Sequence, residues 1–344
     1  MKDVMFLGWG SDDQGVTHYR TKLPARALDA DWVTFDNGRP VINAARSSKH
    51  EIIVIQNCWD PSQLKVLKDI QEGSQATMVA NIDDWVKTIG KMKGKHGYAD
   101  YFARHDIVDG SLRYLEMCDA CFVSTPWLAN KVKPYFDKDQ VYLCRNMLDT
   151  DRYEAAPALE RDSGVLLGWS GGTGHRGAFR SISQPVSAIL KSIPEARFVS
   201  VGDDVGKTLE AQVHSRAHNM RWSSLEYYPR HMRMFDISLA PAESNDFYRA
   251  KSQLRLYESA ILGTPLIAHP MYDEMQDGVH GFHAETPGEW YEAMEKLVRD
   301  DDLRAEMGKN MLELSKTFTV EARKHEWEEA IESVRRLREV QRTS

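Results

Sequence analysis

The stretch from Phe235 to Ala268 reads FDISLAPAESNDFYRAKSQLRLYESAILGTPLIA, and it carries the clearest indication of the fold. The apolar run Asp236–Ala240 ends at Pro241 and predicts a buried parallel strand. A polar loop and a helix over Ser252–Leu262 follow, and Gly263 begins the turn into a second strand at Pro265–Ala268. Strand, helix and strand in this order form the repeating unit of a parallel sheet covered by helices.

The same alternation extends through most of the chain. The first half predicts strands at Val4–Gly8, Trp32–Phe35, Ile52–Gln56, Ala76–Ala80, Ala120–Ser124 and Val141–Cys144. The second half restarts the pattern, with strands at Val165–Trp169, Arg197–Val201 and Met220–Trp222 and a helix at Gln184–Ser192. Because Ala, Pro and charged residues interrupt the periodicity at Asp151–Ser163, we place a linker there. The sequence thus predicts an α/β fold of two Rossmann-like, doubly wound domains, residues 1–150 and 151–316.

The chain is predicted to be helical from about Glu285 to its end. One apolar stripe with helical spacing consists of Trp290, Ala293, Met294 and Leu297, and a second consists of Trp327, Ala330, Ile331, Val334 and Leu337. Both stripes are interpreted as faces that pack on the rest of the protein.

Composition narrows the class of protein. The 344 residues have a net charge of -7, and no apolar run approaches the roughly 20 residues of a membrane span. The N-terminus has no basic region followed by a long apolar one, so we expect no secretory signal and a cytoplasmic location. The four cysteines lack the spacing of a disulfide framework or a zinc ribbon and are expected to be core thiols. The net charge disfavours a nucleic-acid binder that uses its whole surface, but allows a local basic groove.

The first candidate site is the glycine-rich turn Gly8–Gly15, which follows the first predicted strand. Its backbone amides could hold a phosphate or a sugar, although Asp13 stands where a dinucleotide fingerprint needs glycine. The alternative is an ordinary strand-to-helix turn. Polar residues near the start of the next helix make this a candidate site: Gly15, His18, Tyr19, Arg20 and Lys22.

The second candidate site opens the second predicted domain with the sequence GWSGGTGHRG at 168–177. Small residues such as Gly171 and Gly172 let backbone amides approach an anion, and His175 and Arg176 add donors and positive charge. This combination suits a diphosphate. The alternative is a flexible turn whose glycines need positive φ.

The third candidate site is the predicted helix that begins near Ser252. Lys251, Arg255 and Glu258 recur at i, i+4 and i+7, so on one continuous helix they share a face over roughly 10 Å. Lys251 could neutralise a diphosphate and Glu258 could accept both hydroxyls of a ribose. The alternative is a solvated helix on which Arg255 and Glu258 form an ion pair.

The residues from Gly168 to Ala268 resemble the donor-binding domain of retaining GT-B glycosyltransferases of family 4, especially short members from bacteria and tailed phages. The matching segments are GWSGGTGHRG at 168–177, DISLAP at 236–241, FYRAKSQLRLYE at 247–258 and ILGTP at 261–265. Segments of the first half match more weakly, namely His18–Arg20, Asn81–Trp85, Asp119–Pro126 and Arg145–Asp149.

The resemblance implies the GT-B architecture, in which the last helix, at 317–344, returns to complete the first domain. It implies a nucleoside-diphosphate sugar, a UDP-sugar, as co-substrate, with no cofactor and no metal. Glu258 would hold the ribose, with Ser252 and Arg255 in the same donor site. Lys251 and His175 or Arg176 would hold the diphosphate and stabilise it as leaving group. Asp83 or Asp84 would position the acceptor hydroxyl, whose proton passes to the β-phosphate.

The sequence departs from the family pattern at two positions. Ala250 stands where many relatives have a carboxylate that binds the sugar, and Glu243 or Asp246 could substitute for it. Asn81-Ile-Asp83-Asp84 stands where relatives often have a histidine near the transferred sugar. The identity of the sugar therefore stays open.

A basic segment between Trp85 and Gly97 gives the only indication of the acceptor. It contains Lys87, Lys91, Lys93, Lys95 and His96 without any acidic residue, and aromatic residues flank it. Such a segment could follow a phosphate backbone, face anionic lipid head groups, or be a solvated loop. No basic amphipathic helix of the membrane-binding kind is apparent, which favours a soluble or nucleic-acid acceptor. By analogy with the phage members, hydroxymethylated pyrimidines in DNA are a candidate acceptor.

Other functions stay open at this point. The acceptor could instead be a cell-surface glycan, a lipid or a small molecule. A nucleotide-sugar epimerase has the same architecture, and a GT-B-like protein could bind without catalysis. Little beyond the first glycine turn favours an NAD-dependent oxidoreductase. The sequence does not indicate an oligomeric state.

Overall fold

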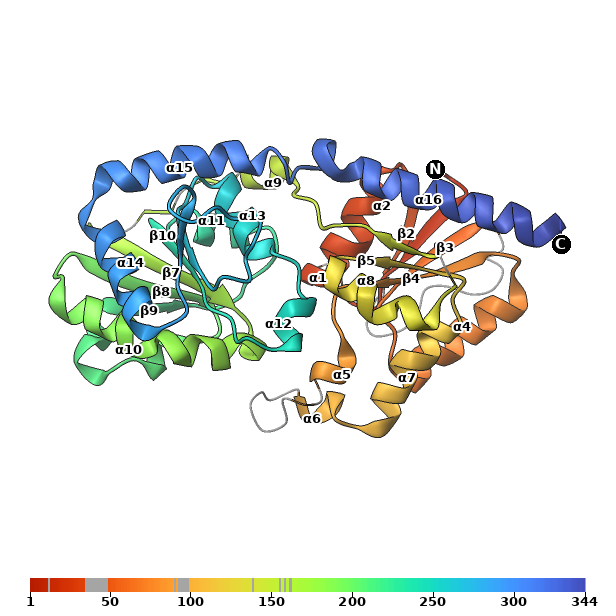
Figure 1. Ribbon diagram of the computed structural model, residues 1–344, viewed down its shortest axis with the longest axis horizontal. Coiled ribbons are helices and arrows are strands. Elements are labelled where there is room, and N and C mark those ends of the chain that lie inside the picture. The colour runs from red at the N-terminus through yellow and green to blue at the C-terminus, as the bar shows by residue number, and fades with distance from the viewer. Residues whose placement is uncertain are drawn as a thin grey trace.

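The computed structural model describes residues 1–11, 13–34, 49–89, 91, 99–137, 139–154, 156–157, 159–160 and 163–343. It consists of two α/β domains side by side, each built on a parallel sheet of six strands, as the sequence predicts (Figure 1).

The first sheet has the order β2-β1-β3-β4-β5-β6. Its strands are β1 Val4–Leu7, β2 Asp31–Val33, β3 Ile52–Gln56, β4 Thr77–Ile82, β5 Ala120–Val123 and β6 Val141–Leu143. Strands β1, β3, β4 and β5 are almost wholly buried, which explains why they read as continuous apolar runs. The helical segments are α1 Gly15–Thr17, the π-helical η1 His18–Lys22, α2 Leu23–Ala27, α4 Pro61–Gly73, α5 Val86–Ile89, α6 Ala99–Phe102, α7 His105–Glu116, α8 Pro126–Val132 and η3 Lys133–Tyr135.

The second sheet has the order β12-β11-β10-β7-β8-β9. Its strands are β7 Val165–Gly171, β8 Ala196–Gly202, β9 Ala217–Met220, β10 Ile237–Ala240, β11 Leu266–Ala268 and β12 Gly281–His283. The helical segments are η4 Thr173–His175, α10 Arg176–Ser192, η5 Val205–Thr208, η6 Ala211–Arg216, α11 Tyr228–Met232, α12 Asp246–Ala250, α13 Leu254–Ile261, α14 Pro287–Arg299 and α15 Asp301–Ser315.

Two segments join the domains. Helix α9, Thr150–Glu154, overlaps the start of the predicted linker and buries Tyr153. Helix α16, Val320–Thr343, crosses back and lies along the first domain, so that both chain termini lie on that domain (Figure 1). Its Trp327 is fully buried against Phe6 and Phe122 of the first sheet, at ring-centroid distances of 6.1 and 6.0 Å. The last helix therefore supplies part of the core beside the first strands.

Several predicted boundaries are wrong. Strand β9 lies at Ala217–Met220 rather than Met220–Trp222, and β12 was not predicted. Helix α10 begins at Arg176, well before Gln184, because Ala178, Phe179 and Ile182 form a continuous buried face in its first half. Pro185 lies inside this helix without ending it. The helix predicted over Ser252–Leu262 begins at Leu254.

Candidate active site between the domains

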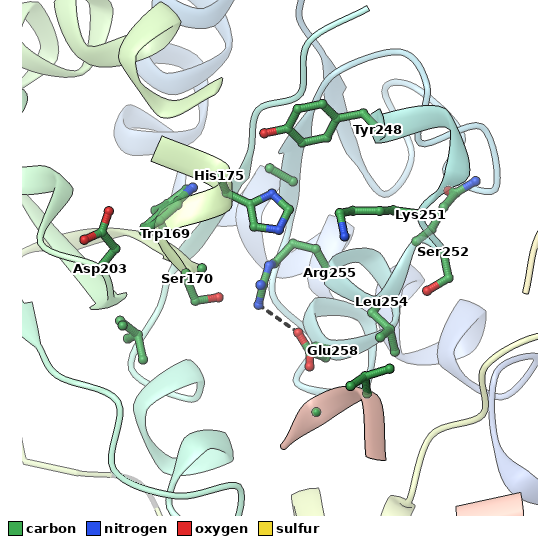
Figure 2. A pocket seen from close by; sticks show the side chains of 18 of the residues that line it. Trp169, Ser170, His175, Asp203, Tyr248, Lys251, Ser252, Leu254, Arg255 and Glu258 are labelled. Atoms are coloured by element: carbon green, nitrogen blue, oxygen red, sulfur yellow. Dashed lines mark hydrogen bonds and ion pairs between the residues drawn. The ribbon is translucent and has the colours of Figure 1, made fainter. Parts of the chain in front are cut away.

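A cavity of about 630 Å³ opens between the two domains, at the carboxyl ends of their strands. The first domain contributes Gly15, Val16, Tyr19, Asp83 and Asp84, and the second contributes residues from the ends of β7, β8 and β10 and from α13. Open α/β sheets bind ligands at this edge, because loops that follow parallel strands converge there. Figure 2 shows His175, Lys251, Arg255 and Glu258 gathered around the cavity.

The glycine loop after β7 forms one wall of the cavity. Both Gly171 and Gly172 line it, together with His175, whose ring lies 5.6 Å from that of Tyr248. A Cβ on Gly172 would meet no atom within 4 Å, whereas one on Gly171 would lie 2.8 Å from the Trp169 ring. Neither glycine is among those with positive φ in the described residues. Close packing against Trp169 therefore requires glycine at 171 but not at 172, and the interpretation that the loop needs positive φ is wrong.

Arg176 does not line this cavity, contrary to the prediction that it holds a diphosphate there. Its Nε and Nη2 donate to the two carboxylate oxygens of Asp203 at 2.7 and 2.6 Å. Asp203 follows β8 beside the glycine loop and itself lines the cavity. A bidentate pair of this kind holds the guanidinium in a fixed place against Asp203, so Arg176 acts on the cavity wall through that carboxylate.

Glu258 is buried on α13 and receives hydrogen bonds from both domains. Its Oε1 accepts from the Tyr19 hydroxyl at 3.1 Å, and its Oε2 accepts from the Tyr228 hydroxyl at 3.0 Å and from Arg255 at 2.7 Å. The expected Arg255–Glu258 ion pair is present, but it faces the cavity and not solvent. A carboxylate has about four acceptor positions, so among the described contacts one position on Oε1 is still open. Glu258 thus has one open acceptor position, on Oε1, for a further donor.

Lys251 does not lie on the helix that bears Arg255 and Glu258. It terminates α12 with φ -75° and ψ 142°, and α13 starts only at Leu254. The prediction of one continuous helix face is therefore wrong. The side chain of Lys251 still lines the cavity, where its Nζ lies 2.7 Å from Oδ1 of Asp84 in the other domain.

Asp83 lies next to this ion pair and also lines the cavity. Its Oδ1 accepts a hydrogen bond from Nδ2 of Asn57 at 2.5 Å. Burial and the neighbouring charge of Asp84 raise the pKa of Asp83 to about 6. A carboxyl group that titrates this close to neutrality in a cleft can hold or exchange a proton with a bound hydroxyl.

The predicted acceptor-side residues separate into two groups. Gly15 and Tyr19 line the cavity, whereas His18 and Arg20 are absent from its lining and are buried in the first domain. Arg20 donates to Asn81 and Asn146 and lies 4.6 Å from the Trp327 ring centroid, which makes it a structural residue. Burial, with smaller effects of nearby Arg152 and Lys22, lowers the pKa of His18 to about 3.

Two further predictions concern the basic segment and the missing carboxylate. Lys91 is exposed, whereas Lys93 and Lys95 lie outside the described residues. Ala250 is fully buried and its carbonyl accepts from Thr125. Neither Glu243 nor Asp246 lines the cavity, so neither occupies the place expected of a substitute carboxylate.

Sequence reasoning missed Tyr228 and Trp222. Tyr228 lines the cavity from α11, and its hydroxyl also contacts Ser170 at 3.0 Å. Trp222 lines the cavity while 46% exposed, with its ring 5.2 Å from that of Tyr228. Trp222 fell at the end of a predicted strand and Tyr228 in no recognised motif, so the sequence carried no signal that either residue belongs to a site.

Two kinds of feature are absent from the described residues. No helix among them combines the length and apolarity needed to cross a membrane. Within the same part of the chain, no group of three or more His, Cys, Asp or Glu side chains could hold a metal ion.

Comparison with solved structures identifies the fold. The chain is similar to Anabaena HepE in complex with UDP-glucose, with 14% identity and a TM-score of 0.68 over 96% of this chain and 99% of that one. It is also similar to a glycosyltransferase from Rickettsia africae (11%, TM-score 0.63, 97% and 99%). A Listeria monocytogenes protein provisionally described as a UDP-N-acetylglucosamine 2-epimerase matches as well (10%, 0.58, 97% and 96%). The chain thus has the GT-B architecture. No protein-family model and no curated protein matches its sequence.

Proposed function

We propose that this protein is a glycosyltransferase that moves a sugar from a UDP-sugar to an acceptor hydroxyl. The observation that carries the proposal is the composition of the cavity between the domains. On the second domain, Glu258 has an open acceptor position that suits a ribose hydroxyl. The glycine loop and Lys251 of the same domain suit a diphosphate and its negative charge. On the first domain the cavity presents Asp83 and Asp84, which can bind an acceptor.

The residues divide the chemistry between leaving group and acceptor. Lys251, His175 and the amides of the glycine loop at Gly171 and Gly172 stabilise the diphosphate as the bond to the sugar breaks. Asp83 or Asp84 holds the acceptor hydroxyl, and the proton of that hydroxyl passes to the β-phosphate. The acceptor therefore attacks the sugar from the face that the diphosphate leaves, and the sugar is transferred with retention. The positive charge of Lys251 serves at the place where other transferases use a divalent ion, so we propose that the reaction needs no metal.

The donor is tested by thermal unfolding in the presence of UDP-, GDP- and ADP-sugars. A ligand at 100 times its Kd adds about 2.7 kcal/mol of stability, so a UDP-sugar should raise the Tm clearly. Replacing Glu258 with Gln should reduce the shift, since a charged acceptor of the ribose is lost. Replacing the exposed Glu313 with Gln is the matched control. Stabilisation by ADP- or GDP-sugars alone would reject the uridine donor.

For the acceptor we propose DNA that contains hydroxymethylated pyrimidines. Lys87 in α5 and the exposed Lys91 belong to the basic segment that follows Asp83 and Asp84 in the chain. Changing Lys87, Lys91, Lys93 and Lys95 to Ala should raise the KM for DNA and lower the log–log salt slope by about 0.7–0.9 per lost phosphate contact. If the quadruple variant shows the salt dependence of the wild type, or if no donor supports transfer to such DNA, this acceptor is rejected in favour of a glycan, lipid or small molecule.

The second candidate function is a nucleotide-sugar epimerase, which the similarity to the Listeria protein favours. An epimerase would release UDP and an isomerised sugar in the absence of any acceptor. Product analysis by chromatography and NMR, with donor alone and with donor plus acceptor, separates the two functions.

A further inference from the structure

The hydroxyl of Tyr19 connects the first domain to the glutamate that we propose holds the donor ribose. Tyr19 lies in η1 and is 4% exposed, and Glu258 lies in α13 of the other domain. Their side chains meet at 3.1 Å in the cavity wall. Sequence reasoning placed Tyr19 on the acceptor side, but its polar contact in the structure is on the donor side.

The direction of each hydrogen bond in this cluster follows from the carboxylate. A carboxylate only accepts, so the protons of Tyr19 and Tyr228 both point to Glu258. Burial and the Glu258 charge raise the pKa of Tyr19, which keeps its hydroxyl protonated as a donor. The hydroxyl of Tyr153 in α9, 3.3 Å from that of Tyr19, then donates to Tyr19. A donor chain therefore runs from α9 through η1 to Glu258.

This chain restrains one oxygen of Glu258 specifically. Oε2 is held within the second domain by Tyr228 and Arg255, whereas Oε1 contacts Tyr19 and has the one open acceptor position. A ribose hydroxyl that binds there needs Oε1 in a fixed orientation. Among the described contacts, only the first domain provides that restraint.

We propose that Tyr19 is a positioning residue for the donor: its hydroxyl orients Oε1 of Glu258 for a ribose hydroxyl, so the nucleotide site is complete only when the two domains are together. This inference rests on the proposed function, because it takes the ligand of Glu258 to be a nucleoside diphosphate. It makes the affinity for the ribose depend on a residue of the domain opposite the donor.

The test measures the affinity of UDP and of 2′,3′-dideoxy-UDP for the wild-type protein and for Tyr19→Phe by calorimetry. The variant should bind UDP about tenfold more weakly, because Oε1 of Glu258 loses the hydroxyl that orients it toward the ribose. Its affinity for the dideoxy nucleotide should change less than about twofold. The ratio of the two affinities reports on ribose recognition, and a general structural defect would weaken both ligands equally.

The matched control is Tyr142→Phe, which removes a hydroxyl from β6 of the same domain, where Tyr142 packs against Phe122 and takes no part in the donor chain. It should leave the affinity ratio within about threefold of the wild type. Equal weakening of both ligands by Tyr19→Phe, no weakening, or tighter UDP binding would overturn the role of Tyr19 and leave the proposed function standing. Absence of UDP binding by the wild-type protein would overturn the proposed function, and this inference with it.

Discussion

At the scale of single residues, Asp83 and Asp84 are adjacent in the chain but their carboxylates have different partners. Asp84 is paired with Lys251 of the other domain, while Asp83 has an amide partner in Asn57 and a raised pKa of about 6. The pair Asp83-Asp84 became a candidate through the resemblance of Asn81–Trp85 to the transferase family. Its division of roles could not be predicted, because the partner Lys251 is distant in sequence.

The pH dependence of the reaction should reveal Asp83. If its carboxylate form holds the acceptor, the rate should rise with pH and reach half its plateau near pH 6. Asp83→Asn should lower the rate and abolish this inflection. In Asp84→Asn the inflection should move to lower pH, because the like charge that raises the pKa is gone. The measurement is kcat/KM from pH 4.5 to 8.5, and an unchanged inflection in Asp83→Asn would exclude the assignment.

His18 should make the fold sensitive to acid. Its folded pKa of about 3 lies below its ordinary value of 6.5, so the unfolded chain binds more protons between these values. The stability that the neutral ring provides is complete above pH 6.5 and is lost as the pH falls, by up to about 1.4 kcal/mol per pH unit. Urea unfolding of wild type and His18→Gln at several pH values checks this. A constant difference between the two proteins across pH 4–7 would contradict it.

At the scale of elements, the predictable strands are those buried on both faces by β-branched and other apolar residues. The break between α12 and α13 was not predictable, because no Gly or Pro marks residues 251–253. Contacts from the first domain accompany the break: Thr125 donates to the Ala250 carbonyl at 3.2 Å and Asn146 donates to Ser252 at 2.7 Å. Residues 251–253 therefore form a turn held by tertiary contacts, although the local sequence pattern predicts a helix there.

Strand β12 was also missed, because it is only three residues long and too short to show an apolar pattern. Its first residue, Gly281, has φ +147°, and a Cβ there would lie 1.9 Å from the carbonyl oxygen of Leu266 in β11. The close approach of two backbones, rather than an apolar pattern, positions this edge strand.

Gly281→Ala should therefore destabilise the protein by several kcal/mol, because alanine disfavours this backbone angle and its Cβ would clash with the Leu266 carbonyl. The control is Gly288→Ala, at the start of α14, where a Cβ would meet no atom within 4 Å. Thermal and urea unfolding should show the second variant as stable as the wild type or slightly more so. Equal stability of the two variants would contradict the role of Gly281.

At the scale of the whole molecule, direct contacts hold the domains together around the cavity. Asp13 of the first domain accepts from the Leu225 amide of the second at 2.6 Å, and Lys251 pairs with Asp84. The sequence could predict two sheets and many of the side chains at their edges. It could not predict which of these side chains meet across the cleft, because such pairs depend on how the two domains dock.

Helix α16 should be essential to the stability of the first domain. Trp327→Ala removes a fully buried indole that packs on Phe6 and Phe122 and donates to the Arg145 carbonyl at 3.0 Å. The expected cost is about 3–5 kcal/mol. Val340→Ala, at a 65% exposed position of the same helix, should change stability by less than about 0.5 kcal/mol. Urea unfolding followed by circular dichroism measures both, and a similar small effect of the two changes would contradict the prediction.

The return of α16 also has a consequence for the order in which the protein matures during synthesis. The ribosome makes the first sheet first, yet the core of that domain includes Trp327, Ala330, Ile331 and Val334 from the last helix. The second domain, by contrast, has all its strands and its covering helices in one continuous stretch of chain. Although domains generally fold in the order of translation, here the N-terminal domain must wait, partly assembled, until the C-terminal helix leaves the exit tunnel.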